Sequence, residues 1–205
     1  MKLVRLCARP ALRSEHGQRL TELVANELDW DRVAERAAVH GVLGMVYHHL
    51  VGRVPDRVPP RLLQSMARAS RTIQEKNLLA IRALNRIAGA FSEAGVPLLT
   101  FKGPLLAHTY YGNVAFRQFG DIDVLVERAR LGRAQSLLEA HGYRRRHART
   151  DSELKRHYQD QLGVEFQHRR TSVVVELHWA LLNRTFSFRL APEAVWARAQ
   201  AVSLG

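Results

Sequence analysis

The sequence predicts an α+β protein in which helices come first and a unit of alternating strands and helices follows. Apolar residues recur at three- and four-residue steps through the first part of the chain, which is typical of amphipathic helices. Beyond Gly95, short apolar runs of strand length alternate with helical patterns. We therefore expect a helical region over 1–95, a sheet-containing core over 96–190, and over 191–205 the start of a C-terminal region that looks truncated.

The N-terminal pattern predicts several short helices and then one long helix. Short amphipathic stretches run from about Ser14 to Leu50, and a proline-rich break at 52–60 ends them. A long helix is expected from Arg61 to about Ala94, because apolar residues there follow one stripe of a helix. Gly95 and Pro97 then form a typical helix stop.

The second part of the chain predicts strands and helices in alternation. In chain order they are a strand in VPLLTF (96–101), a helix in GPLLAHTYYG (103–112), a strand in DIDVLV (121–126), a helix in ARLGRAQSLLEAHG (129–142), and strands in YRRRHA (143–148), GVEFQHR (163–169) and TSVVVELHW (171–179). The last two are spaced like a hairpin. Another helix is expected after Pro192.

Composition excludes several classes of protein. Of the 205 residues, 46% are hydrophobic and 24% are charged, which is typical of a globular protein rather than a disordered one. No apolar run approaches the roughly 18 residues that span a bilayer, and Arg5 and Arg9 interrupt any signal-peptide core. We therefore expect a cytoplasmic protein with no membrane partner. The single cysteine, Cys7, excludes an intrachain disulfide and a cysteine-based zinc site.

The net charge is strongly positive. Lys and Arg number 31 against 19 Asp and Glu, giving +12, and most of the basic residues are arginine. One interpretation is an anionic partner such as a nucleotide, RNA or an acidic protein, because arginine donates two hydrogen bonds to phosphate. The other is a genome-wide preference for arginine codons. Aromatic residues do not alternate with the basic run YRRRHAR (143–149), so nucleic acid is an alternative partner that we do not favour.

Two aspartates flank one isoleucine in RQFGDIDVLVERA (117–129). In a strand, Asp121 and Asp123 project from the same face, whereas Ile122 projects from the other. Neighbouring carboxylates repel each other, so one of them must raise its pKa unless a cation or solvent relieves the repulsion. The pair therefore predicts a cationic partner.

A third carboxylate, Glu176, interrupts the apolar run VVVELHW. It shares its strand face with His178, whereas Val175 and Leu177 lie on the other face. Three carboxylates on adjacent strands are explained if they bind magnesium, because two ions about 3.5–4 Å apart need shared acidic ligands. The alternative for Glu176 is a strand end that is exposed or paired with an arginine.

The strand in LLTFKGPLL leads into Lys102 and Gly103, followed by Pro104, which suits the first turn of a helix. Glycine allows close approach of a phosphate and lysine supplies charge, so this corner is a candidate phosphate site. Arg117, four residues before Asp121, is a candidate contact for the same anion.

Taken together, FKGPLLAHTYYG, RQFGDIDVLV, HGY and VELHW resemble the uncharacterised nucleotidyltransferase family of the DNA polymerase beta superfamily. The resemblance covers about residues 80–200. It implies a polymerase beta-like core with a small mixed β-sheet flanked by helices. It also implies transfer of a nucleoside monophosphate from an NTP, with release of pyrophosphate.

The resemblance also implies roles for individual residues. Asp121, Asp123 and Glu176 become the expected catalytic residues and ligands of two Mg²⁺ ions, which Mn²⁺ can replace; Glu176 is also expected to assist deprotonation of the acceptor. Gly103 matches the glycine of the superfamily's phosphate-binding turn, but the usual following serine or glycine is missing. Lys102, together with Arg117, is therefore expected to bind the triphosphate through charge.

His178 is expected to orient a ligand, to contact substrate, or only to pack. The expected reaction moves AMP from ATP onto a hydroxyl of an unknown small molecule or protein. Two alternatives stay open at this point: a non-catalytic, arginine-rich module that binds RNA or protein on a degenerate transferase fold, and a glycosyltransferase with an Asp-x-Asp motif.

Overall fold

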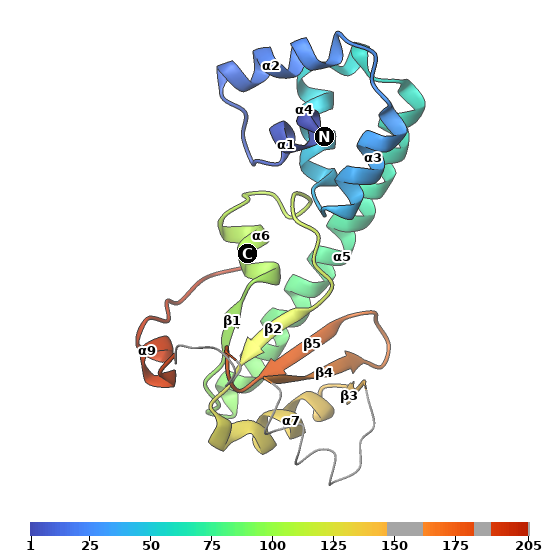
Figure 1. Cartoon of the computed structure of the whole chain (residues 1–205). Helices are drawn as coiled ribbons and strands as arrows, with labels where there is room; N and C mark the ends of the chain where they lie inside the picture. The colour runs from blue at the N-terminus through green and yellow to red at the C-terminus, as the bar shows by residue number, and fades with distance from the viewer. Residues whose placement is uncertain (147–161, 183–189, 205) are drawn as a thin grey trace. The chain divides into compact units, whose positions relative to one another are not determined.

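The computed structural model describes residues 1–146, 162–182 and 190–204 (Figure 1). The chain divides into two compact units. The first unit comprises residues 1–78 and 106–119, and the second comprises residues 79–105 together with the described residues from 120 onward. An N-terminal group of helices and a sheet flanked by helices confirm the predicted α+β class.

The first unit is helical. Its elements are α1 (Lys2–Cys7), α2 (Ser14–Val24), α3 (Trp30–Val39), α4 (Leu43–Arg53), the 3₁₀ turn η1 (Pro55–Arg57) and the first part of α5 (Pro60–Glu93). The predicted short helices and the long helix are confirmed. The helix α1 was not predicted, yet Leu3, Val4 and Cys7 on it are buried in the core of this unit.

The second stretch of the first unit is fastened to the helices at two points. The side-chain amide of Asn77 donates hydrogen bonds to the carbonyl oxygens of Val114 (2.5 Å) and Arg117 (2.8 Å). Gly44 makes a close approach possible, because a Cβ there would lie 1.9 Å from the carbonyl oxygen of Ala115. A buried amide and a glycine therefore fix the backbone that carries Arg117.

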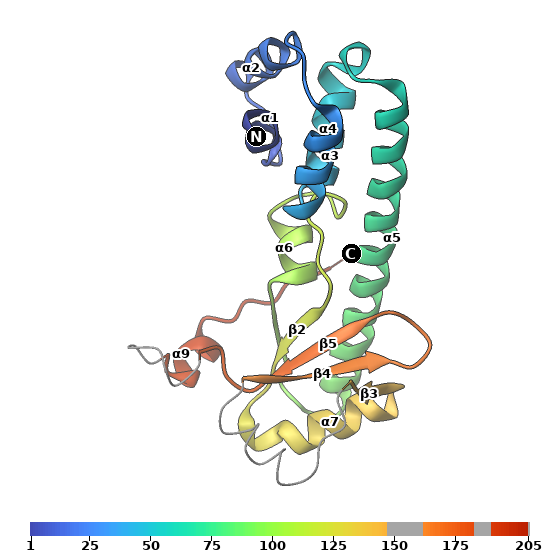
Figure 2. The same cartoon turned by 45° about the vertical axis from the view of Figure 1, so that its right-hand side comes forward.

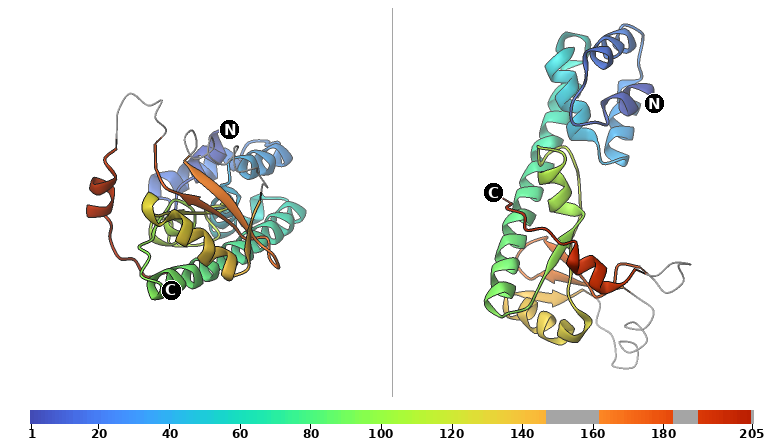
Figure 3. Two further views of the ribbon diagram at one scale, coloured as in Figure 1. Left: turned by 90° about the horizontal axis from the view of Figure 1, so that it is seen from below. Right: turned by 90° about the vertical axis from the view of Figure 1, so that its left-hand side faces the viewer.

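The second unit contains a five-stranded sheet. Its strands are β1 (Leu99–Phe101), β2 (Ile122–Leu125), β3 (Tyr143–Arg145), β4 (Gly163–His168) and β5 (Val174–His178). The spatial order is β1-β2-β5-β4-β3; β2 and β5 are parallel and the other pairs are antiparallel, so the sheet is mixed (Figures 2 and 3). Every strand predicted from the pattern is present, although positions 147 and 148 of the third lie outside the described residues.

The second unit also contains helical segments. They are the second part of α5, the first residues of α6 (Gly103–Thr109), the 3₁₀ turn η2 (Arg128–Arg130), α7 (Leu131–Ala140) and α9 (Pro192–Ala197). The predicted helices at 103–112 and 129–142 are thereby confirmed. Among the described residues, no helix has the length and apolarity that crossing a membrane requires.

The core of the second unit explains why its central strands are apolar. All four residues of β2 are buried, and Ile122, Val124, Phe166, Val175 and Leu177 are each fully buried. A strand covered on both faces reads as a continuous apolar run. A charged residue within β2 or β5 is therefore the exception that marks a site.

Candidate metal and nucleotide site

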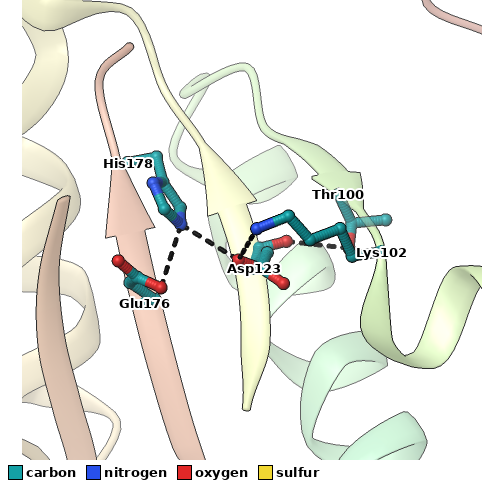
Figure 4. Close-up of polar contacts among 5 residues, drawn as sticks. All are labelled: Thr100, Lys102, Asp123, Glu176 and His178. Atoms are coloured by element: carbon teal, nitrogen blue, oxygen red, sulfur yellow. Dashed lines mark hydrogen bonds and ion pairs between the residues drawn. The ribbon is translucent and has the colours of Figure 1, made fainter. Parts of the chain in front are cut away.

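The site forms where the parallel strands β2 and β5 lie side by side. Their register pairs Asp123 with Glu176 and Leu125 with His178. Because residues i and i+2 of a strand share a face, His178 projects beside Glu176 and next to Asp123 (Figure 4). Each of these three side chains offers an oxygen or nitrogen atom that lies within 4.8 Å of the other two.

Two nitrogen groups converge on Asp123. His178 Nε2 lies 3.1 Å from Asp123 Oδ1 and 3.4 Å from Glu176 Oε2, and Lys102 Nζ lies 3.2 Å from the same Asp123 oxygen. Asp123 and His178 are only 3% and 6% exposed, whereas the Glu176 side chain is 31% exposed. The site therefore consists of a buried carboxylate–imidazole pair, Asp123 and His178, with the partly exposed carboxylate of Glu176 beside it.

The pKa values follow from these contacts. Burial opposes ionisation of Asp123, but hydrogen bonds from His178 and Lys102 outweigh it and lower the pKa of that carboxyl. The hydrogen bond from His178 also lowers the pKa of Glu176. Burial disfavours the imidazolium, yet the two carboxylates overcome that effect and raise the pKa of His178 to about 9. Asp123 and Glu176 are therefore stabilised as anions.

The pKa of Asp121 shifts upward, opposite to the pKa values of Asp123 and Glu176. Burial, followed by the charges of Asp123 and Glu176, raises the pKa of Asp121. The repulsion expected for this pair of aspartates is therefore present, and it raises the pKa of Asp121 rather than that of Asp123. Asp121 lies near enough to feel the neighbouring charges but is outside the compact group of three ligand atoms.

The turn between β1 and α6 directs Lys102 to the site. Lys102 has a φ of 58°, a left-handed conformation that residues with a side chain rarely adopt, and Gly103 follows with a φ of 25°. The ammonium group also lies 5.1 Å from the centroid of the Phe101 ring. Thr100 Oγ1 donates a hydrogen bond of 3.1 Å to the carbonyl oxygen of Asp123, which ties β1 to β2 beside this turn.

Two residues of β4 shape the site and were not predicted. A Cβ at Gly163 would lie 3.0 Å from His178 Nδ1 and 3.2 Å from Glu176 Oε1, so glycine leaves room for both side chains. Glu165 pairs in register with Glu176, forms an ion pair of 3.0 Å with Arg146, and adds to the charge that raises the pKa of Asp121. Extending the predicted hairpin by its register would have found Glu165.

The structure thus brings four predicted residues together: Lys102, Asp123, Glu176 and His178. Gly103 lies next to Lys102 in the chain and begins α6. Arg117 belongs to the first unit, where its carbonyl oxygen accepts the hydrogen bond from Asn77. Its contact with a triphosphate stays a prediction.

The donor set fits a divalent cation. Two carboxylates and an imidazole are all recognised metal ligands, and Asp123 and Glu176 are held in the deprotonated form that binding requires. His178, whose pKa is raised to about 9, would release its Nε2 proton when a cation binds. The lysine beside them shows that a positive charge is favourable at this position.

Comparison with known proteins gives one result. The family model described as uncharacterised nucleotidyltransferase matches residues 26–205 of the chain. No curated protein and no solved structure matches it significantly.

Proposed function

The chain belongs to the uncharacterised nucleotidyltransferase family and is therefore a transferase, and we propose that it moves AMP from ATP onto a hydroxyl group of a small molecule or protein. An NTP substrate is implied by the family. The observation that carries the proposal is the pairing of Asp123 with Glu176 across β2 and β5, with Lys102 on the same carboxylate.

The proposed reaction forms one P–O bond and breaks another. The acceptor oxygen attacks the α-phosphorus of ATP, and the bond from that phosphorus to the bridging oxygen of pyrophosphate breaks. Glu176 takes the hydroxyl proton in this scheme, which its exposure makes feasible because an acceptor can reach it.

Asp121, Asp123 and Glu176 are the proposed ligands for two divalent ions, Mg²⁺ with Mn²⁺ as a substitute. Such ions supply Lewis-acid stabilisation of the charge on the triphosphate and on the attacking oxygen. The raised pKa of Asp121 supports this assignment, because burial and then the charges of Asp123 and Glu176 disfavour its anion, which a cation bound nearby would stabilise.

Lys102 is the proposed triphosphate contact, together with Gly103 and Arg117. The Lys102 side chain is 58% exposed, so its ammonium group can turn from Asp123 toward a bound phosphate. That exchange would keep the charge of the site balanced as the substrate enters.

The family match supports nucleotidyl transfer over both alternatives considered from the sequence, the RNA- or protein-binding module and the glycosyltransferase. The dependence on salt and on metal distinguishes the RNA- or protein-binding module from a nucleotidyltransferase. A binding module loses affinity for RNA steeply with added salt, whereas turnover depends on the divalent ion.

The test incubates the full chain with Mg²⁺, each NTP in turn, and a panel of hydroxyl-bearing small molecules and cellular proteins. Pyrophosphate release and a mass gain of one nucleoside monophosphate on the acceptor are measured. We expect both with ATP, and neither in the Asp121→Ala or Asp123→Ala variant. Glu127→Gln is a matched control, because this glutamate is exposed and pairs with Arg130 away from the three ligand atoms. Equal turnover in the aspartate variants and the unmodified chain would contradict the proposal.

A further inference from the structure

The His178 ring is buried and contacted on more than one side. It lies 5.1 Å from the Phe101 ring at an interplanar angle of 59°, and Gly163 lies against its Nδ1. These contacts fix the ring so that Nε2 points between Asp123 and Glu176 (Figure 4). One nitrogen therefore faces two carboxylate oxygens at once.

The distances match those between neighbouring ligands of one metal ion. In an octahedral site with bonds of about 2.1 Å, adjacent ligand atoms lie about 3.0 Å apart. His178 Nε2 lies 3.1 Å from Asp123 Oδ1 and 3.4 Å from Glu176 Oε2. A single N–H group points well at only one acceptor, whereas an ion coordinated by all three atoms satisfies both carboxylates.

A nitrogen ligand changes which ion is preferred. Mg²⁺ favours oxygen ligands and retains its water, whereas first-row transition ions accept imidazole nitrogen as well as carboxylate. We infer that His178 is a metal ligand, and that Asp123, Glu176 and His178 form a mixed nitrogen–oxygen position that binds Mn²⁺ in preference to Mg²⁺. This inference rests on the metal site of the proposed function, and it names the ion that one of the two positions selects.

The test measures coordination directly and needs no nucleotide. Mn²⁺ is titrated into the full chain, without a histidine tag, and free Mn²⁺ is followed by electron paramagnetic resonance, with Mg²⁺ as competitor. Pulsed measurements on the bound ion then detect coupling to a directly bonded nitrogen. We expect such coupling in the unmodified chain, and we expect it to change when histidine is labelled with ¹⁵N, which requires no substitution.

Two variants locate the nitrogen. His178→Gln should lose the coupling and bind Mn²⁺ at least about tenfold more weakly, with a smaller change for Mg²⁺. His141→Gln is the matched control, because His141 is exposed, follows the last residue of α7 and hydrogen-bonds to the carbonyl oxygen of Leu137, so its replacement should leave coupling and affinity unchanged. Circular dichroism checks that both variants fold, and the labelling result stands if His178→Gln does not.

Three outcomes would overturn the inference: Mn²⁺ bound without nitrogen coupling, no Mn²⁺ binding, or equal affinity for Mn²⁺ and Mg²⁺. These outcomes are separate from failure of the proposed function. Nitrogen-coupled Mn²⁺ without turnover of any NTP supports the ligand and counts against the activity. Turnover of an NTP with Mn²⁺ bound only by oxygen ligands supports the activity and counts against His178 as a ligand.

Discussion

Asp123 and Glu176 stand opposite each other in the register of two parallel neighbouring strands. Both side chains therefore project from one face of the sheet, and His178, two residues beyond Glu176, joins them. The pairing of β2 with β5 alone sets the positions of these three side chains, and no loop residue has to place them.

Replacement of Asp123 by asparagine should abolish metal binding with little change in volume. The amide cannot supply the anionic oxygen that His178 and Lys102 now contact. We expect turnover to fall at least about 100-fold and Mn²⁺ affinity to fall with it. Isothermal titration and pyrophosphate release measure the two effects, and retention of both in Asp123→Asn would exclude Asp123 as a ligand.

The metal-free protein should become less stable as the pH rises from about 6.5 to about 9. The folded pKa of His178 lies above its unfolded value, so its stabilisation is complete below the unfolded pKa and is lost through the folded one. The loss is at most about 3 kcal/mol. Urea unfolding in a chelator at pH 6 and pH 10 measures it, and His178→Gln should remove most of the difference in this range. An identical pH profile in that variant would assign the effect elsewhere.

The left-handed backbone at Lys102 can be separated from the charge of its side chain. Lys102→Gly and Lys102→Met both remove the ammonium group, but only glycine adopts a φ of 58° without strain. We expect Lys102→Gly to be more stable than Lys102→Met by about 1 kcal/mol in urea unfolding. Both variants should raise the KM for ATP more than they lower kcat, and Lys102→Arg should restore part of the KM. A KM for ATP unchanged in both would remove Lys102 from the nucleotide site.

A methyl group at Gly163 should disturb the site although every proposed ligand residue is left unsubstituted. In Gly163→Ala the new carbon would meet His178 Nδ1 at 3.0 Å and Glu176 Oε1 at 3.2 Å, so both side chains must shift by a few tenths of an ångström. We expect Mn²⁺ affinity to fall about tenfold. Gly132→Ala is the control, since a Cβ there has nothing within 4 Å. Equal affinity in the two variants would show that the site tolerates the shift.

Local pattern was enough to predict most of the elements, because strands buried on both faces and amphipathic helices each leave a periodic signal. It also singled out Asp121, Asp123 and Glu176 as candidates, since a carboxylate beside or within an apolar strand is conspicuous, and their catalytic and metal-binding roles stay predictions. The helix α1 escaped prediction because its apolar face consists of only Leu3, Val4 and Cys7, which tertiary packing nevertheless buries. Helix propensity in six residues is too weak a signal to reveal it.

Contacts between distant residues could not be predicted in the same way. That Lys102 meets Asp123, and that His178 faces both carboxylates, depends on the left-handed turn and on the strand order β1-β2-β5. The sequence placed Arg117 four residues before Asp121, but the structure assigns the two to different units. Proximity in the chain therefore does not establish that Arg117 belongs to the site.

The strand pairing that forms the site also determines when the site can form while the ribosome is synthesising the chain. Asp123 and His178 are 55 residues apart, and among the described residues β5 is the last strand of the sheet in chain order. A chain still leaving the ribosome can form α5, β1 and β2 and can bring Lys102 to Asp123. Glu176 and His178 join Asp123 only when β5 has emerged and paired with β2. Closing so long a loop is slow compared with helix formation. If the proposed metal site is correct, we therefore expect metal capture to begin only once β5 has paired with β2.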